Sequence, residues 1–386
     1  MSLITPQKAD ELMLSNVEVL ECETVRLENS LGRILREDLS ADRPFPPFDR
    51  VTMDGVAFRS SDLDGQPLTL RGIHAAGSPP PPPLKSGQCW QIMTGSEMPP
   101  DCDTVVPYEQ VTLTENSVKI ECSPTPGKFI HRKGSDASQG DILLRSGTRI
   151  GPGHLGILAS IGAVEFKVTR LPLIKILTTG DELVPVDQTP LPHQLRRSNG
   201  ITLLSAIQDW GPAEVTWEHL ADDLETTTTG IAKALEEADL VILSGGISKG
   251  KKDYVRPALE SLRGEPLFHG VAQRPGKPLA FWKGIIALPG NPNSTLTTFQ
   301  RYVVPLLHRL IGASDISRVT LPLAEPVQRH PFLTQFIPAM MNSEGRAMPL
   351  LPQNSGDFVT PLDAKFYLEI PPGEGSPDVL GVSIYP

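Results

Sequence analysis

The sequence predicts a multi-domain α/β plus β protein whose central domain has three layers, α/β/α, around a mostly parallel sheet. Three observations predict this class. Strand-length apolar runs alternate with helical patterns over residues 173–311, the order typical of a parallel sheet with helices on both faces. Short strands and turns with weak helical periodicity fill residues 52–140. From residue 319 onward the chain is again proline-rich and strand-like.

The first part of the chain predicts a capped helix followed by β structure. Thr5 can cap the helix, Pro6 stands at its first position, and its body covers residues 8–16. The proline run at 79–83 predicts a rigid polyproline II loop, with docking of a proline-recognising partner as the alternative. Strands are predicted at residues 68–70, 104–106, 111–113 and 164–168, and a helix at 151–161.

The α/β region follows, with Ser198 and Asn199 placed to cap its first helix. Its strands are predicted at residues 174–177, 215–217, 240–243 and 285–288, and its helices after Asn199 to about residue 210 and at 224–238, 254–262 and 293–311. These patterns divide the chain into an α/β domain (1–21 and 171–312), a linking domain (22–40 and 141–170), a small β domain (41–140) and a C-terminal β domain (313–386).

Bulk composition restricts the class of partner. The formal net charge of −10 over 386 residues, with no basic face, argues against a nucleic-acid binder. We find neither a signal peptide nor a membrane-spanning apolar run, which predicts a cytoplasmic protein without membrane association. The 4 cysteines lack metal-type spacing and predict reduced thiols.

Four tight turns, each after an apolar run, are the main functional signal. They read TTGDEL (178–183), SGGIS (244–248), RPGKP (274–278) and LPGNPNS (288–294). Turns at the carboxyl ends of parallel strands are where open α/β sheets bind ligands, and their glycines let a phosphate approach the main chain. The turns therefore predict a site for a phosphorylated, anionic ligand.

Charge near these turns supports the same prediction. Residues 243–283 hold eight basic and three acidic side chains in an otherwise acidic protein. Carboxylates follow three strand ends, as Asp181-Glu182, Asp222-Asp223 and Asp253. Each alone is typical of a helix cap, but together they can hold Mg²⁺ between protein and phosphates, because this ion prefers oxygen ligands.

The segment GISKG (246–250) also matches a hydrolase nucleophile elbow with Ser248 as nucleophile. His269, His308 and His330 could complete such a site. The hydrolase hypothesis is weaker than the anion-site hypothesis. In a nucleophile elbow the helix begins directly after the nucleophile, whereas here helical periodicity begins further along the chain. The sequence has neither a P-loop nor a dinucleotide-binding glycine motif.

Taken together, these motifs resemble one family, the molybdopterin molybdenumtransferases, or MoeA proteins, of which the E domains of gephyrin and of plant proteins are relatives. The matching segments span nearly the whole chain: LGR (31–33), MDG (53–55), IMTG (92–95), GSD (134–136), DY (253–254) and the four turns. The resemblance implies that adenylylated molybdopterin and molybdate become molybdenum cofactor and AMP, with Mg²⁺ required.

The resemblance also implies roles for single residues. The candidate catalytic residues are Asp54, Thr94, Asp136 and Glu182, and the candidate metal ligands are Asp222 and Asp253. Gly245, Gly246 and Ser248 would cradle the pterin phosphate, with Lys277, Pro278 and Ser294 on the molybdate side. The substrate-binding set is completed by Thr179, Gly180, Arg274, Pro289, Pro292 and Ser355.

The chain departs from the family pattern in four places. Arg274 stands where many relatives have lysine, and Asn293 where valine is usual. The segment RVT (50–52) replaces Asn-Ser-Ala, and the C-terminal arginine of relatives has no counterpart near residues 334–336. Altered anion handling at the molybdate side is therefore an open alternative to simple subgroup variation, because arginine offers a planar fork where lysine offers a point charge.

The resemblance finally implies an elongated homodimer with a shared cleft, in which Asp54 and Thr94 of one copy face the α/β domain of the other. Molybdopterin adenylyltransferase and molybdoenzyme apoproteins are the implied further partners. A gephyrin-like scaffold without catalysis is the main rival function, and a serine hydrolase is the second. The retained carboxylates favour the enzyme over the scaffold.

Overall fold

The computed structural model describes residues 3–247, 254–313, 318–375 and 379–383. The chain forms two compact units. The first unit comprises Met1–Glu37, Ser146–Gly151 and Glu165–Pro386, and the second comprises Asp38–Arg145 and Pro152–Val164. The division into four domains drawn from the sequence stays a prediction. None of the described helices is both long and apolar enough to cross a membrane.

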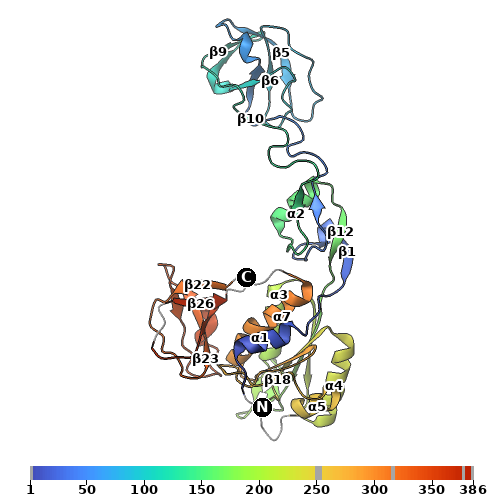
Figure 1. Ribbon diagram of the computed structural model, residues 1–386, viewed down its shortest axis with the longest axis vertical. Coiled ribbons are helices and arrows are strands. Elements are labelled where there is room, and N and C mark those ends of the chain that lie inside the picture. Colours follow the sequence, from blue (N-terminus) through green and yellow to red (C-terminus); the bar gives the residue numbers. More distant parts are fainter. Residues whose placement is uncertain (1–2, 248–253, 314–317, 376–378, 384–386) are drawn as a thin grey trace. The chain divides into compact units, whose positions relative to one another are not determined.

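A six-stranded sheet forms the centre of the first unit (Figure 1). Its order is β16-β13-β17-β21-β20-β18, and the first four strands are parallel. These strands are β16 (Glu214–Leu220), β13 (Leu173–Thr179), β17 (Leu240–Ser244) and β21 (Ile285–Leu288). The antiparallel edge consists of β20 (Ala280–Trp282) and β18 (Phe268–His269). Every residue of β17 and β21 is buried, as expected for strands covered on both faces.

Helices cover both faces of this sheet (Figure 1). On one face, α1 (Pro6–Leu14), α3 (Asn199–Trp210) and α7 (Val304–Ile311) pack against Ile174 and Ile242 of the sheet. On the other face, α4 (Leu224–Glu237) and α5 (Val255–Arg263) pack against Leu177 and Leu243. Alternate residues of each strand therefore point into two separate cores. The predicted three-layer α/β/α domain with a mostly parallel sheet is confirmed.

The first helix begins as its sequence predicts. Thr5 is the N-cap of α1, its Oγ1 accepts a hydrogen bond from the Lys8 amide at 3.2 Å, and Pro6 is the first helical residue. Pro6, Ala9 and Met13 are the buried residues of this helix, at helical spacing. The cap and the apolar stripe together explain why the segment forms a helix and which side faces the sheet.

The long helix expected over residues 293–311 contains a π-helical turn. It consists of α6 (Pro292–Thr298), a π-helical turn (Phe299–Val303) and α7. Pro305 has no N–H to donate to the carbonyl of residue 301, so the regular bonding pattern breaks next to it. The wider turn keeps Arg301 and Tyr302 buried. The expected long helix is therefore present from Pro292 to Ile311, with a π-helical turn inside it.

A second sheet of the first unit is built mainly from the end of the chain. Its order is β19-β23-β25-β26-β22, with β24 (Ala347–Pro349) paired to β23 (Thr334–Met341). The other strands are β22 (Arg318–Pro322), β25 (Phe366–Ile370) and β26 (Val379–Ser383). The edge strand β19 (Gln273–Arg274) comes from the α/β region and pairs in parallel with β23. The turn after β19 thus starts from this second sheet, which corrects its expected place after a strand of the central sheet.

The sheet of the second unit and four short strand pairs complete the fold. The second unit has a six-stranded sheet of order β7-β4-β6-β5-β9-β8, as the sequence predicts for an all-β region. Its strands are β4 (Gly55–Phe58), β5 (Leu68–His74), β6 (Gln88–Ile92), β7 (Thr104–Pro107), β8 (Val111–Leu113) and β9 (Ser117–Ile120), and its helix is α2 (Pro152–Ser160). Further pairs in this unit are β2 (Leu39–Ser40) with β11 (Ile142–Leu144), and β3 (Arg50–Val51) with β10 (Ile130–His131). The first unit adds β1 (Cys22–Arg26) with β12 (Glu165–Thr169), and β14 (Leu183–Val184) with β15 (Leu195–Arg196).

The cysteines behave as the sequence predicts. Cys22, Cys89, Cys102 and Cys122 are all free thiols. Burial raises the pKa of Cys89 and of Cys102 to about 12, so both stay protonated at neutral pH. The two buried thiols therefore act as small apolar groups in the core of the second unit.

The starts of β13 and β17 are held together by one partly buried ion pair. Arg170 donates to both oxygens of Asp239 at 2.7 and 2.6 Å, and the Leu173 amide donates to Asp239 at 2.8 Å. Burial alone would raise the pKa of Asp239, but the hydrogen bonds from Arg170 and Leu173 outweigh it and hold that pKa below its ordinary value. The charged carboxylate is thus the form that stabilises the fold.

We expect Asp239→Asn to lower the free energy of unfolding by about 1–3 kcal/mol at pH 7. The folded pKa is depressed, so this contribution is present above the unfolded value of about 3.9 and is lost as pH falls through the folded pKa. Urea denaturation of both proteins between pH 7 and pH 3 measures it. A difference that stayed constant, or grew, toward pH 3 would contradict the assignment.

Candidate active site

The four turns line one cleft of ≈ 1420 Å³ in the first unit. Three of them follow the parallel strands β13, β17 and β21, and the fourth follows β19. Ser248 and Asp253 fall outside the described residues. Asp181 and Asp223 do not line the cleft. The other residues of this unit to which the resemblance gives a role all line it: Thr179, Gly180, Glu182, Asp222, Gly245, Gly246, Arg274, Lys277, Pro278, Pro289, Pro292, Ser294 and Ser355.

Glycines let the strand-end turns pack closely. Gly245 has φ +99°, and a Cβ added there would lie 2.9 Å from the Thr179 carbonyl oxygen. Gly246 has φ +61°, and its Cβ would lie 2.7 Å from Cγ2 of Val255. A Cβ on Gly290 would be 3.4 Å from Gly245 Cα. Side chains at 245 and 246 would be strained and would clash with Thr179 and Val255, so glycine is required at these two positions for the main chain to form the wall of the cleft.

Asn199 joins these turns from the first position of α3. Its Nδ2 group donates to Gly290 O at 2.7 Å, to Ser244 Oγ at 3.0 Å and to Thr295 Oγ1 at 3.2 Å. The expected capping role is wrong, because Ser198 has helical backbone angles and makes no side-chain cap bond. The sequence did not reveal that Asn199 joins the turns of the cleft, because an Asn at the start of a helix predicts an N-cap.

The carboxylates at the ends of β13 and β16 divide into two kinds. Glu182 and Asp222 line the cleft. Asp181 and Asp222 exchange hydrogen bonds, each carboxylate accepting from the other's amide at 3.1 Å, which clips the two strand ends together. Asp223 caps α4 through the Thr226 amide at 2.8 Å, and bonding to Thr226 holds its pKa below the usual range. Asp223 is thus a structural cap, the alternative left open for each of these residues.

Fewer of the basic side chains counted over residues 243–283 line the cleft than the sequence suggested. Of the described basic residues in 243–283, Arg274 and Lys277 line it. Arg256 pairs with Glu260 at 2.5 Å and Lys283 with Glu18 at 3.5 Å, and neither lines the cleft. Nearness in sequence therefore overstated the local charge.

Two further cations, which the sequence reasoning missed, belong to the cleft. Arg196 and Arg197 line it, and Arg197 Nε donates to the Leu183 carbonyl at 3.2 Å. The pairing of β15 with β14 places them there. The signal available in the sequence was the arginine pair directly before the Ser-Asn of α3.

A neutral histidine supports the end of β13. Thr178 Oγ1 lies 3.0 Å from His219 Nδ1 and accepts a hydrogen bond from Trp217 Nε1 at 3.0 Å. Since the Thr178 hydroxyl accepts from the indole, it is free to donate to His219 Nδ1. Burial, helped by the positive charge of Arg197, lowers the pKa of His219, so the ring is uncharged at neutral pH.

The remaining predicted residues lie in the second unit. Asp54 and Thr94 meet because they flank β4 and β6, where Gly55 pairs with Ile92. The Thr94 amide donates to Asp54 Oδ1 at 2.6 Å, and this bond holds the pKa of Asp54 below its usual value. Asp54 is therefore an ionised, exposed carboxylate at neutral pH.

Asp136 is held by a histidine that the sequence reasoning missed. His131 Nε2 lies 2.7 Å from Asp136 Oδ1, while Arg50 NH2 lies 3.2 Å from His131 Nδ1. Arginine can only donate, so Nδ1 accepts and the ring proton sits on Nε2, where it is donated to Asp136. The His131 bond, followed by one from Ser135, holds the pKa of Asp136 below its ordinary range.

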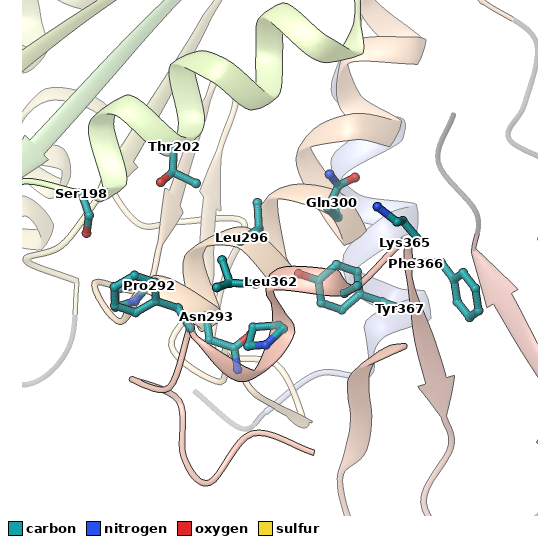
Figure 2. A pocket seen from close by; sticks show the side chains of 13 residues that line it. Ser198, Thr202, Pro292, Asn293, Leu296, Gln300, Leu362, Lys365, Phe366 and Tyr367 are labelled. Atoms are coloured by element: carbon teal, nitrogen blue, oxygen red, sulfur yellow. The ribbon is translucent and has the colours of Figure 1, made fainter. Parts of the chain in front are cut away.

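A smaller pocket of ≈ 300 Å³ adjoins the cleft and shares part of its wall, including Ser198, Pro292 and Phe358. Figure 2 shows Leu296 of α6 with Leu362 and Tyr367 in it. Burial raises the pKa of the Tyr367 hydroxyl to about 12. The pocket is mainly apolar, in contrast to the charged cleft.

Two family models match the chain. The model of the MoeA N-terminal region (domain I and II) matches residues 4–162, and that of the probable molybdopterin binding domain matches residues 175–309. The molybdopterin molybdenumtransferase of Synechocystis sp. is 38% identical over 368 residues, or 92% of each chain. The protein of the same name from Haemophilus influenzae is 36% identical over 318 residues, covering 80% of this chain and 78% of its own.

Solved structures agree with these relatives. A molybdopterin biosynthesis MoeA protein from Pyrococcus horikoshii is 31% identical, with a TM-score of 0.78 and 100% of both chains covered. A second structure from Pyrococcus horikoshii OT3, 24% identical with a TM-score of 0.85 and equal coverage, shows the shared fold. The resemblance drawn from the turns is confirmed, and the chain belongs to the family of molybdopterin molybdenumtransferases, the MoeA transferases of molybdenum cofactor biosynthesis.

Proposed function

We propose that this chain inserts molybdenum from molybdate into adenylylated molybdopterin and releases AMP, with Mg²⁺ assisting. The observation that carries the proposal is the single cleft in which glycine turns, cations and carboxylates meet, in a chain of this family. Such a cleft fits a ligand with phosphates, because fixed dipoles and charges stabilise negative charge where it develops. Neither a scaffold nor a hydrolase needs this combination.

Each part of the cleft has a role in this proposal. The bare main chain of Gly245 and Gly246 binds the pterin phosphate, next to Thr179 and Gly180. Arg274 and Lys277 hold the molybdate oxyanion and offset charge as the pyrophosphate bond breaks. Pro278, Pro289 and Pro292 stiffen the turns around Ser294, and Ser355 is held by the Asn291 side chain at 2.7 Å.

Glu182 is the residue that we assign to proton transfer. It follows β13, lines the cleft and belongs to a different strand end from the cations. A carboxylate can accept a proton from the attacking oxygen and later release it. One carboxylate oxygen of Asp222 accepts a hydrogen bond from the Asp181 amide, and this bond fixes the orientation of the Asp222 carboxylate at the strand ends.

The donor set fits Mg²⁺ shared between protein and substrate. No group of three or more His, Cys, Asp or Glu among the described residues could hold a metal alone. Mg²⁺ ordinarily takes one or two carboxylates plus substrate phosphates, and Asp222 of the cleft is the proposed first carboxylate, with Asp253 as the second. When bound, the ion would neutralise charge on the pyrophosphate.

We further propose a homodimer in which Asp54, Thr94 and Asp136 of one copy serve the cleft of the other. The family resemblance and the ionised state of Asp54 and Asp136 support this assignment. Molybdopterin adenylyltransferase is the proposed donor of substrate, and molybdoenzyme apoproteins are the proposed acceptors of the product. A cytoplasmic location remains an expectation from composition.

A heterodimer tests the shared cleft. Asp54→Ala and Glu182→Gln are co-expressed with different affinity tags and the mixed dimer is purified. A shared cleft leaves one of the two sites with both native residues, so we expect about half of the wild-type turnover, with each homodimeric variant nearly inactive. An inactive mixed dimer would place both residues in one copy and overturn the shared arrangement.

The reaction itself is tested by incubating the protein with adenylylated molybdopterin, molybdate and Mg²⁺. We expect AMP release that depends on both molybdate and Mg²⁺, together with cofactor formation. Omission of molybdate is the control. Folded, dimeric protein that releases no AMP would refute the proposed function, and labelling of Ser248 by a fluorophosphonate would favour the hydrolase instead.

A further inference from the structure

A row of buried, hydrogen-bonded side chains supports the turn that carries Arg274 and Lys277 from the side of the protein core. Gln273 is 1% exposed, so its amide needs partners inside the protein. Its Nε2 donates to the Gly276 carbonyl at 3.1 Å, and its Oε1 bonds to the Tyr302 hydroxyl. Because Nε2 is the donor to a carbonyl, Oε1 must be the acceptor and Tyr302 the donor.

Charged groups hold the tyrosine end of this row of side chains. Tyr302 is 0% exposed and lies in the π-helical turn. The Arg301 guanidinium sits 4.8 Å from the centre of the Tyr302 ring. Arg301 in turn donates to both oxygens of Asp10 at 2.7 and 2.8 Å and to Glu369 at 3.1 Å. Charge-assisted bonds to α1 and β25 therefore anchor the tyrosine that supports Gln273.

The turn itself is shaped around the Gln273 amide. Gly276 has φ +87°, and a Cβ there would lie 2.3 Å from Thr298 Cγ2 and 2.9 Å from Gln273 Nε2. The main chain closes the turn with bonds from the Val271 amide to Lys277 O at 2.9 Å and from the Leu279 amide to Gly276 O at 3.2 Å. The loop thus rests on Thr298 and Gln273, with its two cations on the side of the cleft.

We propose that Gln273 and Tyr302 are positioning residues that set the spacing of Arg274 and Lys277 for a tetrahedral oxyanion. This inference rests on the proposed function, because it assigns the oxyanion to this turn. Cations held in place before the anion arrives need no rearrangement on binding, which is where preorganised sites gain affinity. Neither Gln273 nor Tyr302 has to touch the anion for this effect.

The test uses Tyr302→Phe and Gln273→Met, which keep size and remove the hydrogen bonds. Tyr367→Phe is the control, because this tyrosine lines the smaller apolar pocket and not the cleft. We expect each test variant to raise the KM for molybdate about tenfold, since one buried amide partner is lost. The KM for adenylylated molybdopterin stays within about twofold, and the double variant is no worse than the poorer single one.

Direct binding separates positioning from general damage. Isothermal titration of the full-length protein with molybdate shows the same weakening, while urea denaturation confirms that the variants are folded. If Gln273→Met does not fold, Tyr302→Phe carries the test alone. Equal changes in both KM values, or none, overturn the inference. Absence of AMP release by the wild-type protein would instead overturn the proposed function on which it rests.

Discussion

Glu182→Gln lowers turnover by about 10²–10⁴-fold while leaving ligand binding within about threefold. The two side chains have the same shape, but the amide cannot take up a proton at neutral pH. Glu182 lies in the turn after β13 and lines the cleft together with the glycine turns and the cations. Single-turnover AMP release measures the chemical step, and titration with adenylylated molybdopterin measures binding.

A matched carboxylate controls for the loss of charge. Glu225, an exposed residue of the first turn of α4, does not line the cleft, so Glu225→Gln is expected to keep wild-type turnover. If Glu182→Gln retains more than about a tenth of wild-type turnover, the residue has no role in proton transfer. If turnover and binding fall together, Glu182 serves binding rather than chemistry.

Asn199→Asp lowers the free energy of unfolding by about 2–3 kcal/mol and abolishes most of the activity. The native Nδ2 group donates to two hydroxyls and to the Gly290 carbonyl. The hydroxyls of Ser244 and Thr295 can turn and donate to a carboxylate, but Gly290 O cannot. A carboxylate oxygen would then face a carbonyl oxygen, which forces apart the turns that Asn199 joins.

Urea denaturation and the AMP-release assay measure the two effects. Asn116→Asp is the control, because Asn116 is exposed in the hairpin between β8 and β9. We expect that control to unfold within about 0.5 kcal/mol of the wild type. An Asn199→Asp protein as stable and as active as the control would show that the three hydrogen bonds do not hold the cleft together.

The order of elements could be predicted because it depends on local patterns. The run 240–243 has no polar residue, and β17 is buried at every position. Thr5 and Pro6 signalled the start of α1, and the cap bond is present. The turns after β13, β17 and β21 were recognisable because glycine and proline mark them, and close packing requires glycine at 245 and 246.

Three expectations failed where a contact joins distant parts of the chain. The turn at 274–278 follows β19, which pairs with β23, and no local pattern announces a partner about 60 residues away. Asn199 reads as a helix cap but bonds to residues of three other segments. Lys283 counted toward the charge near the turns, yet it pairs with Glu18 in a distant part of the chain.

The sequence by itself determined the α/β plus β class, the glycine turns and the family, since these follow from periodicity, turn chemistry and the spacing of short motifs. The tertiary structure alone decided which polar groups face the cleft and which stabilise the fold. Asp223 caps a helix, Asp222 clips two strand ends, and Gln273 supports a turn from below. The reason is physical, because a hydrogen bond forms only at the right distance and direction in space. Residues of one type therefore cap a helix, join two strand ends or bind a ligand according to which groups the fold brings within about 3 Å of them.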